Sequence, residues 1–282
     1  MMIEDYFSLT ERQAEQFAQL DALYREWNSK INVISRKDID NLYEHHVLHS
    51  LSIAKLLPFQ PGTTILDVVK VAYCNVESLD LKKAYKLVSQ NRKEKIDFYR
   101  FEKDKKLSAG AYLLLKKLLE EEDITKPAFK TEKYGKAYIS NYDNIHFNLS
   151  HSNRIVLCAI SDMAVGVDVE YIDAEIDLSI AKHYFYNSEY ETIMKSENPP
   201  DEFFKYWVLK ESYMKYTGLG MNLELDSFEI IIKDKIRLKN DNENLKFNLF
   251  DIENYKIGIA GNYDVHDLIE YDVGELYPKV QF

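Results

Sequence analysis

The stretch Val165-Gly166-Val167-Asp168-Val169-Glu170 combines an apolar strand with two carboxylates. Alternate side chains of a β-strand project from the same face, so Asp168 and Glu170 point one way while Val167 and Val169 point the other. Clustered carboxylates are costly to hold near a protein interior unless they serve a purpose. The stretch therefore predicts a buried strand that carries part of a functional site.

A second stretch, from Trp207 to Lys215, is predicted to be a helix. Glu211 and Lys215 lie one helical turn apart and therefore share a face. With Asp168 and Glu170 they supply three carboxylates and one ammonium group, a set that suits a hard cation and the phosphates it binds. We expect the chain to act on a phosphate-bearing group.

The composition is typical of a folded globular protein. The chain has 282 residues, of which 46% are hydrophobic and 13% aromatic. It contains no run of the ~20 apolar residues that a membrane span needs. The acidic start, Met1 to Asp5, has no signal-peptide pattern, so a cytoplasmic protein is expected. Cys74 and Cys158 stand in apolar surroundings and are predicted to be buried thiols.

The formal net charge of −11 argues against nucleic-acid binding by the chain as a whole, since phosphate contacts need clustered Lys and Arg. One segment is an exception, because residues 92–106 contain seven basic side chains. These are either a solvated helix face or a docking patch for an anionic partner or ligand. The segment Arg92–Lys105 is predicted to be one helix.

Residues 1 to about 57 are predicted to be helical. Thr10 and Gln13 have the spacing of a capping box, and a second helix is expected over about 38–57. Pro58 then breaks the helical pattern. A short β-branched run, Thr63 to Val68, predicts a buried strand.

This opening resembles the N-terminal part of the bacterial small-subunit rRNA guanine-N7 methyltransferases, also called glucose-inhibited division protein B. The resemblance covers about the first quarter of the chain and rests on segments 24–28, 30–36, 45–51 and 65–68. In that family the last segment leads into a glycine-rich loop that holds S-adenosylmethionine. Here no glycine occurs between Gly62 and Gly110. We therefore expect residues 1–68 to be a fragment without methyltransferase activity, joined by gene fusion; an added docking domain for RNA or a partner is the alternative.

A second domain is predicted to begin at Val69 and to extend to residue 282. Its first element is a strand over Val69–Val76, and helices and then short strands follow. Mixed helices with mostly antiparallel strands indicate the α+β class.

This second part resembles the Sfp-type 4'-phosphopantetheinyl transferases over nearly its whole length. Four segments occur in the expected order. They are Lys133-Tyr134-Gly135-Lys136, Phe147-Asn148-Leu149-Ser150-His151-Ser152, Val165 to Glu170, and Trp207 to Lys215 with its Lys-Glu-Ser core.

The resemblance implies transfer of the phosphopantetheine arm of coenzyme A to a serine of an apo acyl or peptidyl carrier protein, with release of adenosine 3',5'-bisphosphate. It implies a magnesium ion held by Asp168, Glu170 and Glu211. Glu211 is also the expected general base, and Lys215 would stabilise charge on the phosphates. By similarity, coenzyme A would be contacted by Arg92, Lys95, Lys136, Ser150, His151, Asp168 and Lys215.

Several points stay open at this stage. His151 could instead be a hydrogen-bonded histidine at the end of a strand. Leu107 stands where many relatives carry an arginine, and Lys105 or Lys106 would be a poorer bidentate partner for phosphate. Manganese would accept the same oxygen ligands as magnesium. A binding module for coenzyme A or carrier proteins without catalysis is the competing function.

The family also implies a fold. We expect two similar α+β halves, about residues 69–163 and 164–282, related by a pseudo-two-fold axis with the active site between them. A duplicated chain of this kind is expected to be a monomer.

Overall fold

A computed structural model describes residues 2–30, 39–48, 51, 69–240 and 245–278. The chain forms two compact units, residues 1–63 and 64–282. The predicted strand Thr63–Val68 and the last part of the predicted helix over 38–57 lie outside the described residues. Within the described residues, no helix is long and apolar enough to cross a membrane.

The first unit contains short helices beside one long helix. Thr10 begins α1 (Glu11–Lys30) with the expected capping box, since the Thr10 backbone N–H donates to Gln13 Oε1 at 2.9 Å and the Gln13 N–H donates to Thr10 Oγ1 at 3.3 Å. The hydroxyl of Tyr43 donates to the Phe17 carbonyl at 2.7 Å. The other elements are the 3-10 helices η1 (Met2–Asp5) and η2 (Ile39–Asn41) and the π-helix η3 (Leu42–Leu48).

The second unit is built from one arrangement used twice. Its first half contains β1 (Lys70–Asn75), α3 (Leu81–Leu87), α4 (Gln90–Phe98), α5 (Glu102–Glu121), β2 (Phe129–Thr131), β3 (Ala137–Ile139), β4 (His146–Ser152) and β5 (Ile155–Ser161). Its second half contains β6 (Val165–Tyr171), α6 (Ser179–Tyr184), α7 (Asn187–Lys195), α8 (Pro199–Thr217), the short 3-10 helices η4 (Gly220–Asn222) and η5 (Leu225–Ser227), β7 (Ile230–Ile231), β8 (Arg237–Leu238), β9 (Lys246–Ile252) and β10 (Tyr255–Gly261). The chain then ends with β11 (Ile269–Tyr271) and η6 (Val273–Leu276).

The two halves pair their strands in the same way. In the first sheet β5 lies between β1 and β4, and in the second sheet β10 lies between β6 and β9, with all four pairs antiparallel. The hairpins correspond with an offset of 100 residues, because His146 pairs with Ser161 and Lys246 pairs with Gly261. The α+β class and the duplicated fold predicted from the sequence are confirmed.

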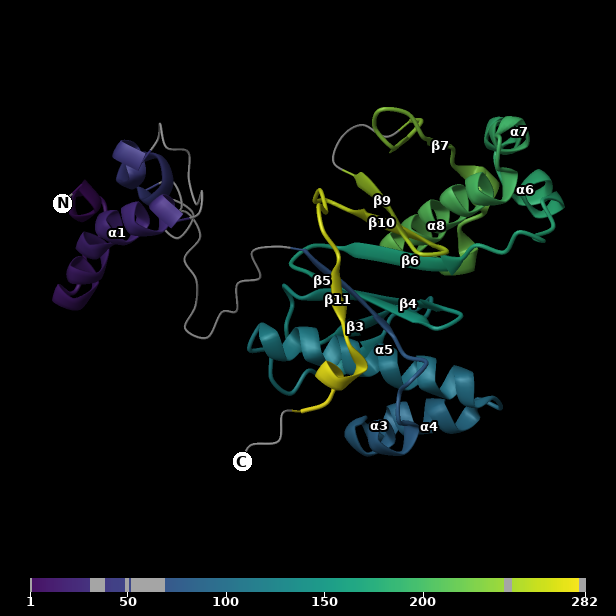
Figure 1. Cartoon of the computed structure of the whole chain (residues 1–282), viewed down its shortest axis with the longest axis horizontal. Helices are drawn as coiled ribbons and strands as arrows, with labels where there is room; N and C mark the ends of the chain where they lie inside the picture. Colours follow the sequence, from purple (N-terminus) through teal and green to yellow (C-terminus); the bar gives the residue numbers. More distant parts are fainter. Residues whose placement is uncertain (1, 31–38, 49–50, 52–68, 241–244, 279–282) are drawn as a thin grey trace. The chain divides into compact units, whose positions relative to one another are not determined.

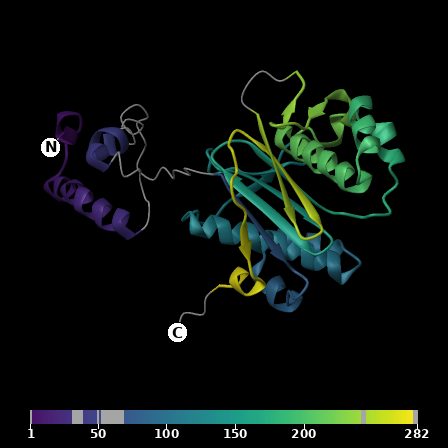
Figure 2. The same cartoon turned by 45° about the horizontal axis from the view of Figure 1, so that its top comes forward.

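Two sheets and two long helices form four layers. A core of β-branched and aliphatic side chains from β1, β5, β6 and β10, including Leu157 and Val167, fills the space between the sheets. The outer face of the first sheet packs on α5 and that of the second sheet packs on α8. Figures 1 and 2 show these two helices on opposite sides of the sheets.

Two glycines let α8 lie close to its sheet. A Cβ atom at Gly166 would stand 2.0 Å from the Ser212 carbonyl oxygen, and one at Gly258 would stand 2.4 Å from that of Val208. Because both contacts are to helix backbone, a side chain at either position would push the helix away. Gly166 of β6 and Gly258 of β10 therefore set the distance between these two strands and the helix that carries Glu211.

The predicted single helix over Arg92–Lys105 is wrong. It divides into α4, which ends at Phe98, and α5, which begins at Glu102. Tyr99 and Phe101, which lie between the two helices, have extended backbone conformations. Ile96 of α4 and Leu107 of α5 are both buried in the core of the first half.

Candidate functional site

The site lies where the edge strand β4 of one sheet meets the edge strand β6 of the other. Three polar side chains alternate along one face of β4, and each accepts a backbone N–H from β6. Asn148 Oδ1 accepts from Val167 at 2.9 Å. Ser150 Oγ accepts from Val169 at 3.4 Å, and Ser152 Oγ accepts from Tyr171 at 3.1 Å. The pattern satisfies the edge of β6 and fixes its register against β4.

Asp168 is the buried centre of this contact. Its side chain is only 4% exposed, and its Oδ1 atom accepts from Ser150 Oγ at 2.8 Å and from Lys215 Nζ at 2.6 Å. Lys215 Nζ also lies 3.0 Å from Ser150 Oγ. The structure therefore brings β4, β6 and α8 together at one carboxylate.

Glu170 and Glu211 stand beside Asp168. Glu170 Oε2 accepts from Ser152 Oγ at 2.7 Å. Burial, and then the negative charge of Asp168, raises the pKa of Glu170 to about 7. The same two causes raise the pKa of Glu211. The charge of Asp168 thus disfavours the charged forms of Glu170 and Glu211, as expected for a site that is completed by a cation.

The residues fit a hard divalent cation in their chemistry. Asp168 Oδ2 is buried and has no hydrogen-bond partner among the described residues. Such an atom costs free energy unless an ion or water satisfies it. Within the described ranges, however, no three Asp, Glu, His or Cys side chains already converge as a metal cluster. A bound cation would therefore draw the carboxylates together.

Two hollows with basic side chains adjoin the site on the side of Lys215. The first is lined by Lys215 and Lys136 together with Gly135 and Gly218. The second is lined by Arg92 and Lys95. Both share Ala137, Phe147 and Leu149 in their walls, so they form neighbouring parts of one surface. Lys130 also lines the second hollow, so an anionic ligand that lay along this surface would meet five basic side chains.

The predicted coenzyme A contacts differ in how they are held. Lys136 Nζ donates to the carbonyls of Tyr216 at 3.0 Å and Val165 at 3.4 Å, and burial lowers the pKa of its amino group. Arg92 is partly buried, with Nη1 3.4 Å from Ser108 Oγ. Lys95 and His151 are exposed. Ser150 is buried, and its hydroxyl is already engaged by Asp168 and Lys215.

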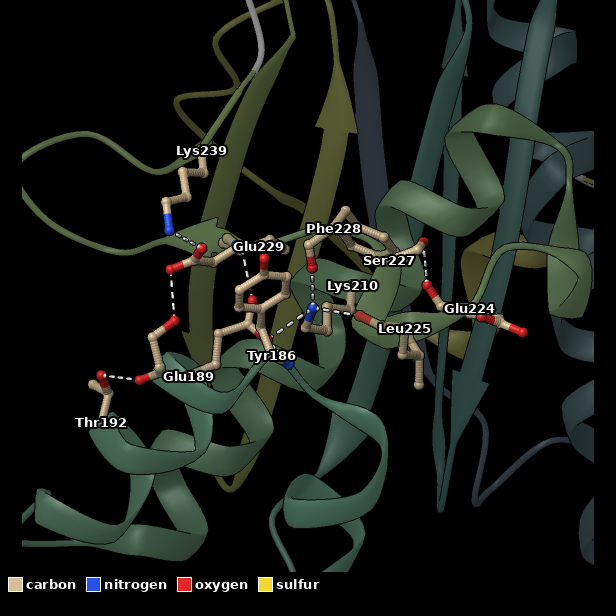
Figure 3. A network of polar contacts seen from close by, with 12 residues as sticks. Tyr186, Glu189, Thr192, Lys210, Glu224, Leu225, Ser227, Phe228, Glu229 and Lys239 are labelled. Atoms are coloured by element: carbon tan, nitrogen blue, oxygen red, sulfur yellow. Dashed lines mark hydrogen bonds and ion pairs between the residues drawn. The ribbon is translucent and has the colours of Figure 1, made fainter.

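A buried ion pair anchors α8 immediately before Glu211. Lys210 Nζ lies 2.8 Å from Glu189 Oε2 of α7 and donates to the carbonyls of Leu225 and Phe228, each at 2.8 Å (Figure 3). Glu189 in turn accepts from the backbone N–H of Ile230 at 2.6 Å. Both side chains are almost fully buried. The pair ties α8 to α7, to η5 and to the residue that follows η5.

Comparison with known proteins identifies the family of the second unit. The profile of the 4'-phosphopantetheinyl transferase superfamily matches residues 164–260, and that of the N-terminal part of 4'-phosphopantetheinyl transferase matches residues 75–162. A 4'-phosphopantetheinyl transferase from Bacillus subtilis is 34% identical over 151 residues, which are 51% of this chain and 67% of that protein. The chain belongs to the 4'-phosphopantetheinyl transferase superfamily. The resemblance predicted for the second unit is confirmed.

The first unit matches a different family. Ribosomal RNA small subunit methyltransferase G of Porphyromonas gingivalis is 66% identical over 68 residues, which are 24% of this chain and 31% of that protein. The corresponding enzyme of Bacteroides thetaiotaomicron is 65% identical over 68 residues, 24% of this chain and 33% of that protein. The chain spans about a third of the length of these methyltransferases. The expected methyltransferase-like opening and the gene fusion are confirmed.

One solved structure is more distant. The holo-acyl-carrier-protein synthase of Thermotoga maritima covers 35% of this chain and 62% of its own, with 17% identity and a TM-score of 0.31. A likeness at that score carries no weight for the fold, and the family assignment rests on the sequence matches.

Sequence reasoning assigned no role to three residues that shape the site. Ser152 donates a hydrogen bond to Glu170, and Asn148 accepts one from the backbone of β6. Gly258 leaves the space that the close approach of α8 requires. The alternation of Asn148, Ser150 and Ser152 along one strand was the available signal for the first two. Gly258 shows no such signal, because its role depends on a helix that lies 41 residues or more before it in the chain.

Proposed function

We propose that this chain transfers the 4'-phosphopantetheine arm of coenzyme A to a serine hydroxyl of an apo acyl or peptidyl carrier protein and releases adenosine 3',5'-bisphosphate. The observation that supports it most directly is Asp168, a buried carboxylate joined to Lys215 and Ser150, with two further carboxylates and a basic surface beside it. Coenzyme A carries its charge on phosphates, which suits this arrangement.

Each residue has a defined part in the proposed reaction. Arg92, Lys95 and Lys136 lie where the nucleotide phosphates would bind. Lys215 neutralises charge on the pyrophosphate as the bond to the leaving phosphate breaks. Glu211 accepts the proton of the serine hydroxyl while the serine oxygen bonds to phosphorus.

A divalent cation, magnesium in this proposal, would be held by Asp168, Glu170 and Glu211. When bound, it supplies positive charge to the pyrophosphate and to the leaving group. Ser150 and Ser152 orient the first two carboxylates from β4. Ser150 and Lys215 both donate to Asp168 Oδ1, which leaves the unpartnered Oδ2 atom for the ion.

The test is intact mass spectrometry of apo carrier proteins incubated with the full chain, coenzyme A and magnesium. A mass gain of one phosphopantetheine arm, absent after chelation and absent with Glu211→Gln, is the expected result. No gain with any of several carrier proteins, while calorimetry still detects coenzyme A binding, would favour a binding module without catalysis.

A further inference from the structure

Lys256 lies between two carboxylates on the sheet of the second half. In the strand register it is opposite Glu170 of β6 on one side and opposite Asp251 of β9 on the other. Side chains that are directly opposite on antiparallel strands project from the same face, with Cβ atoms about 5 Å apart. Its ammonium group could therefore form an ion pair with either carboxylate, and Glu170 belongs to the candidate active site.

The ammonium group is paired with carboxylates other than Glu170. It contacts Asp251, and it lies 2.7 Å from Asp201 Oδ1 in the first turn of α8. Among the ion pairs of the described residues, none joins Lys256 to Glu170. The Lys256 side chain is 5% exposed, so its charge requires carboxylate partners, and Asp201 and Asp251 provide them.

Glu170 is held from the opposite direction. Its Oε2 atom is bonded to Ser152 of β4, and Asp168 is its neighbour on the same face of β6. If Lys256 turned toward Glu170, a buried ammonium group would neutralise one of the three carboxylates. A divalent cation would then have to compete with that ion pair.

We propose that Asp201, together with Asp251, is a positioning residue that holds Lys256 away from Glu170 and so keeps Glu170 available to the divalent cation. This inference rests on the proposed function, because it concerns the same acidic site. Asp201 acts through Lys256 and touches none of the three carboxylates of the site in the contacts described. Its role is therefore separate from catalysis itself.

The test measures the affinity of the full chain for Mn²⁺ alone, by the enhancement of water proton relaxation. The double variant Asp201→Asn/Asp251→Asn leaves Glu170 as the acid opposite Lys256, and we expect Mn²⁺ binding to weaken about tenfold. Adding Lys256→Met to the double variant should restore affinity to within about twofold of the unaltered chain. In the transfer assay, the double variant should need more Mg²⁺ for its half-maximal rate and should approach the normal rate at saturation.

A matched control separates this role from simple support of α8. Lys205 also pairs with Asp201, at 3.2 Å, so Lys205→Met disturbs the same turn of the helix without releasing Lys256. Mn²⁺ affinity should not change in that variant. Circular dichroism establishes whether each variant is folded. If the double variant is unfolded, Asp201→Asn and Asp251→Asn are tested singly. For each of them, Mn²⁺ affinity is compared with and without Lys256→Met.

Two results would overturn the inference. One is a folded double variant that binds Mn²⁺ as tightly as the unaltered chain. The other is a triple variant that stays as weak as the double variant, since the aspartates would then act independently of Lys256. Failure of the proposed function is distinguishable, because in that case the unaltered chain itself would neither transfer phosphopantetheine nor respond to Asp168→Asn in Mn²⁺ binding.

Discussion

The two halves of the second unit have the same strand arrangement, yet only the second half carries the acidic site. With the 100-residue offset between the hairpins, Ala72 occupies the place of Asp168, because Ala72 pairs with Cys158 and Asp168 pairs with Gly258. Likewise Cys74 occupies the place of Glu170. The first half uses these positions for its hydrophobic core, and the second half uses them for polar chemistry. The comparison teaches that the duplicated framework is independent of the side chains that perform the reaction.

The two sheets also differ in what satisfies the backbone beside β1 and β6. Beside β1 the first sheet adds β11 as a parallel neighbour. Beside β6 the second sheet has no such strand among the described residues, and the side chains of β4 satisfy its backbone instead. The edge of β6 is therefore where polar side chains from both halves meet.

Breaking the buried ion pair of the second half should have the largest effect on stability. Lys210→Met leaves Glu189 buried without its partner, which typically costs about 3–5 kcal/mol of unfolding free energy. The comparable pair on the helix of the first half, Lys117 with Glu121, is partly exposed, and Lys117→Met should cost less than about 1 kcal/mol. Urea denaturation measures both, and equal losses would contradict the distinction.

Removing the acidic side chains should abolish most activity without a matching loss of fold. We expect Asp168→Ala and Glu211→Gln each to lower the rate of transfer by at least ~100-fold, the usual effect of losing a charge-stabilising group or a base. The exposed carboxylate of Glu197, in the same half, provides the control through Glu197→Gln, which should have the normal rate. Near-normal rates in either site variant would refute the assignment.

The position of the first half that is equivalent to Asp168 provides a further test. Ala72→Asp places a carboxylate at the position equivalent to Asp168, but in a fully buried apolar core. Without a lysine and a serine beside it, the new group should cost about 2–5 kcal/mol of unfolding free energy at neutral pH, and less in acid where it is protonated. Denaturation at pH 7 and at pH 4 would show this, and stability independent of pH would contradict it.

A smaller effect is expected where the helices approach their sheets. Gly258→Ala meets the Val208 carbonyl of α8, which can move only with the helix, and should cost about 1–3 kcal/mol. Gly110→Ala on α5 meets a side-chain methyl of Val76 at 2.5 Å, which can shift, so its cost should be lower. Denaturation of the two variants shows which one loses more unfolding free energy. A larger loss for Gly110→Ala would mean that the sheet, not the helix, accommodates the change at Gly258.

The smallest effect should come from the first unit. Deleting residues 1–68 removes no residue of the candidate site, and the rate of transfer should not change. The mass-spectrometric assay with the truncated chain is the measurement. Lost transfer by a truncated protein that is still folded would instead support a docking role for this unit.

Local patterns placed the main residues of the candidate site on shared faces, and their proposed roles came from the family resemblance. The period of two in a strand placed Asp168 beside Glu170, and the period of nearly four in a helix placed Glu211 beside Lys215. The charged run at 92–106 was visible but was predicted as one helix, and it folds as two helices whose basic side chains reach different hollows. Periodicity indicates which face a residue takes within one element. It says little about where that element bends to fit a core.

The sequence by itself determined the α+β class, the family of the second unit, the likeness of the first unit to part of a methyltransferase, and the acidic strand and helix of the second half. Only the tertiary structure decided which partners those residues have. Asp168 meets Ser150, which lies 18 residues earlier, and Lys215, which lies 47 residues later, and Lys256 turns to Asp201 although Glu170 is opposite it in the sheet. Such contacts depend on how closely β4, β6 and α8 pack, because hydrogen bonds and ion pairs require separations of about 3 Å that no local pattern specifies.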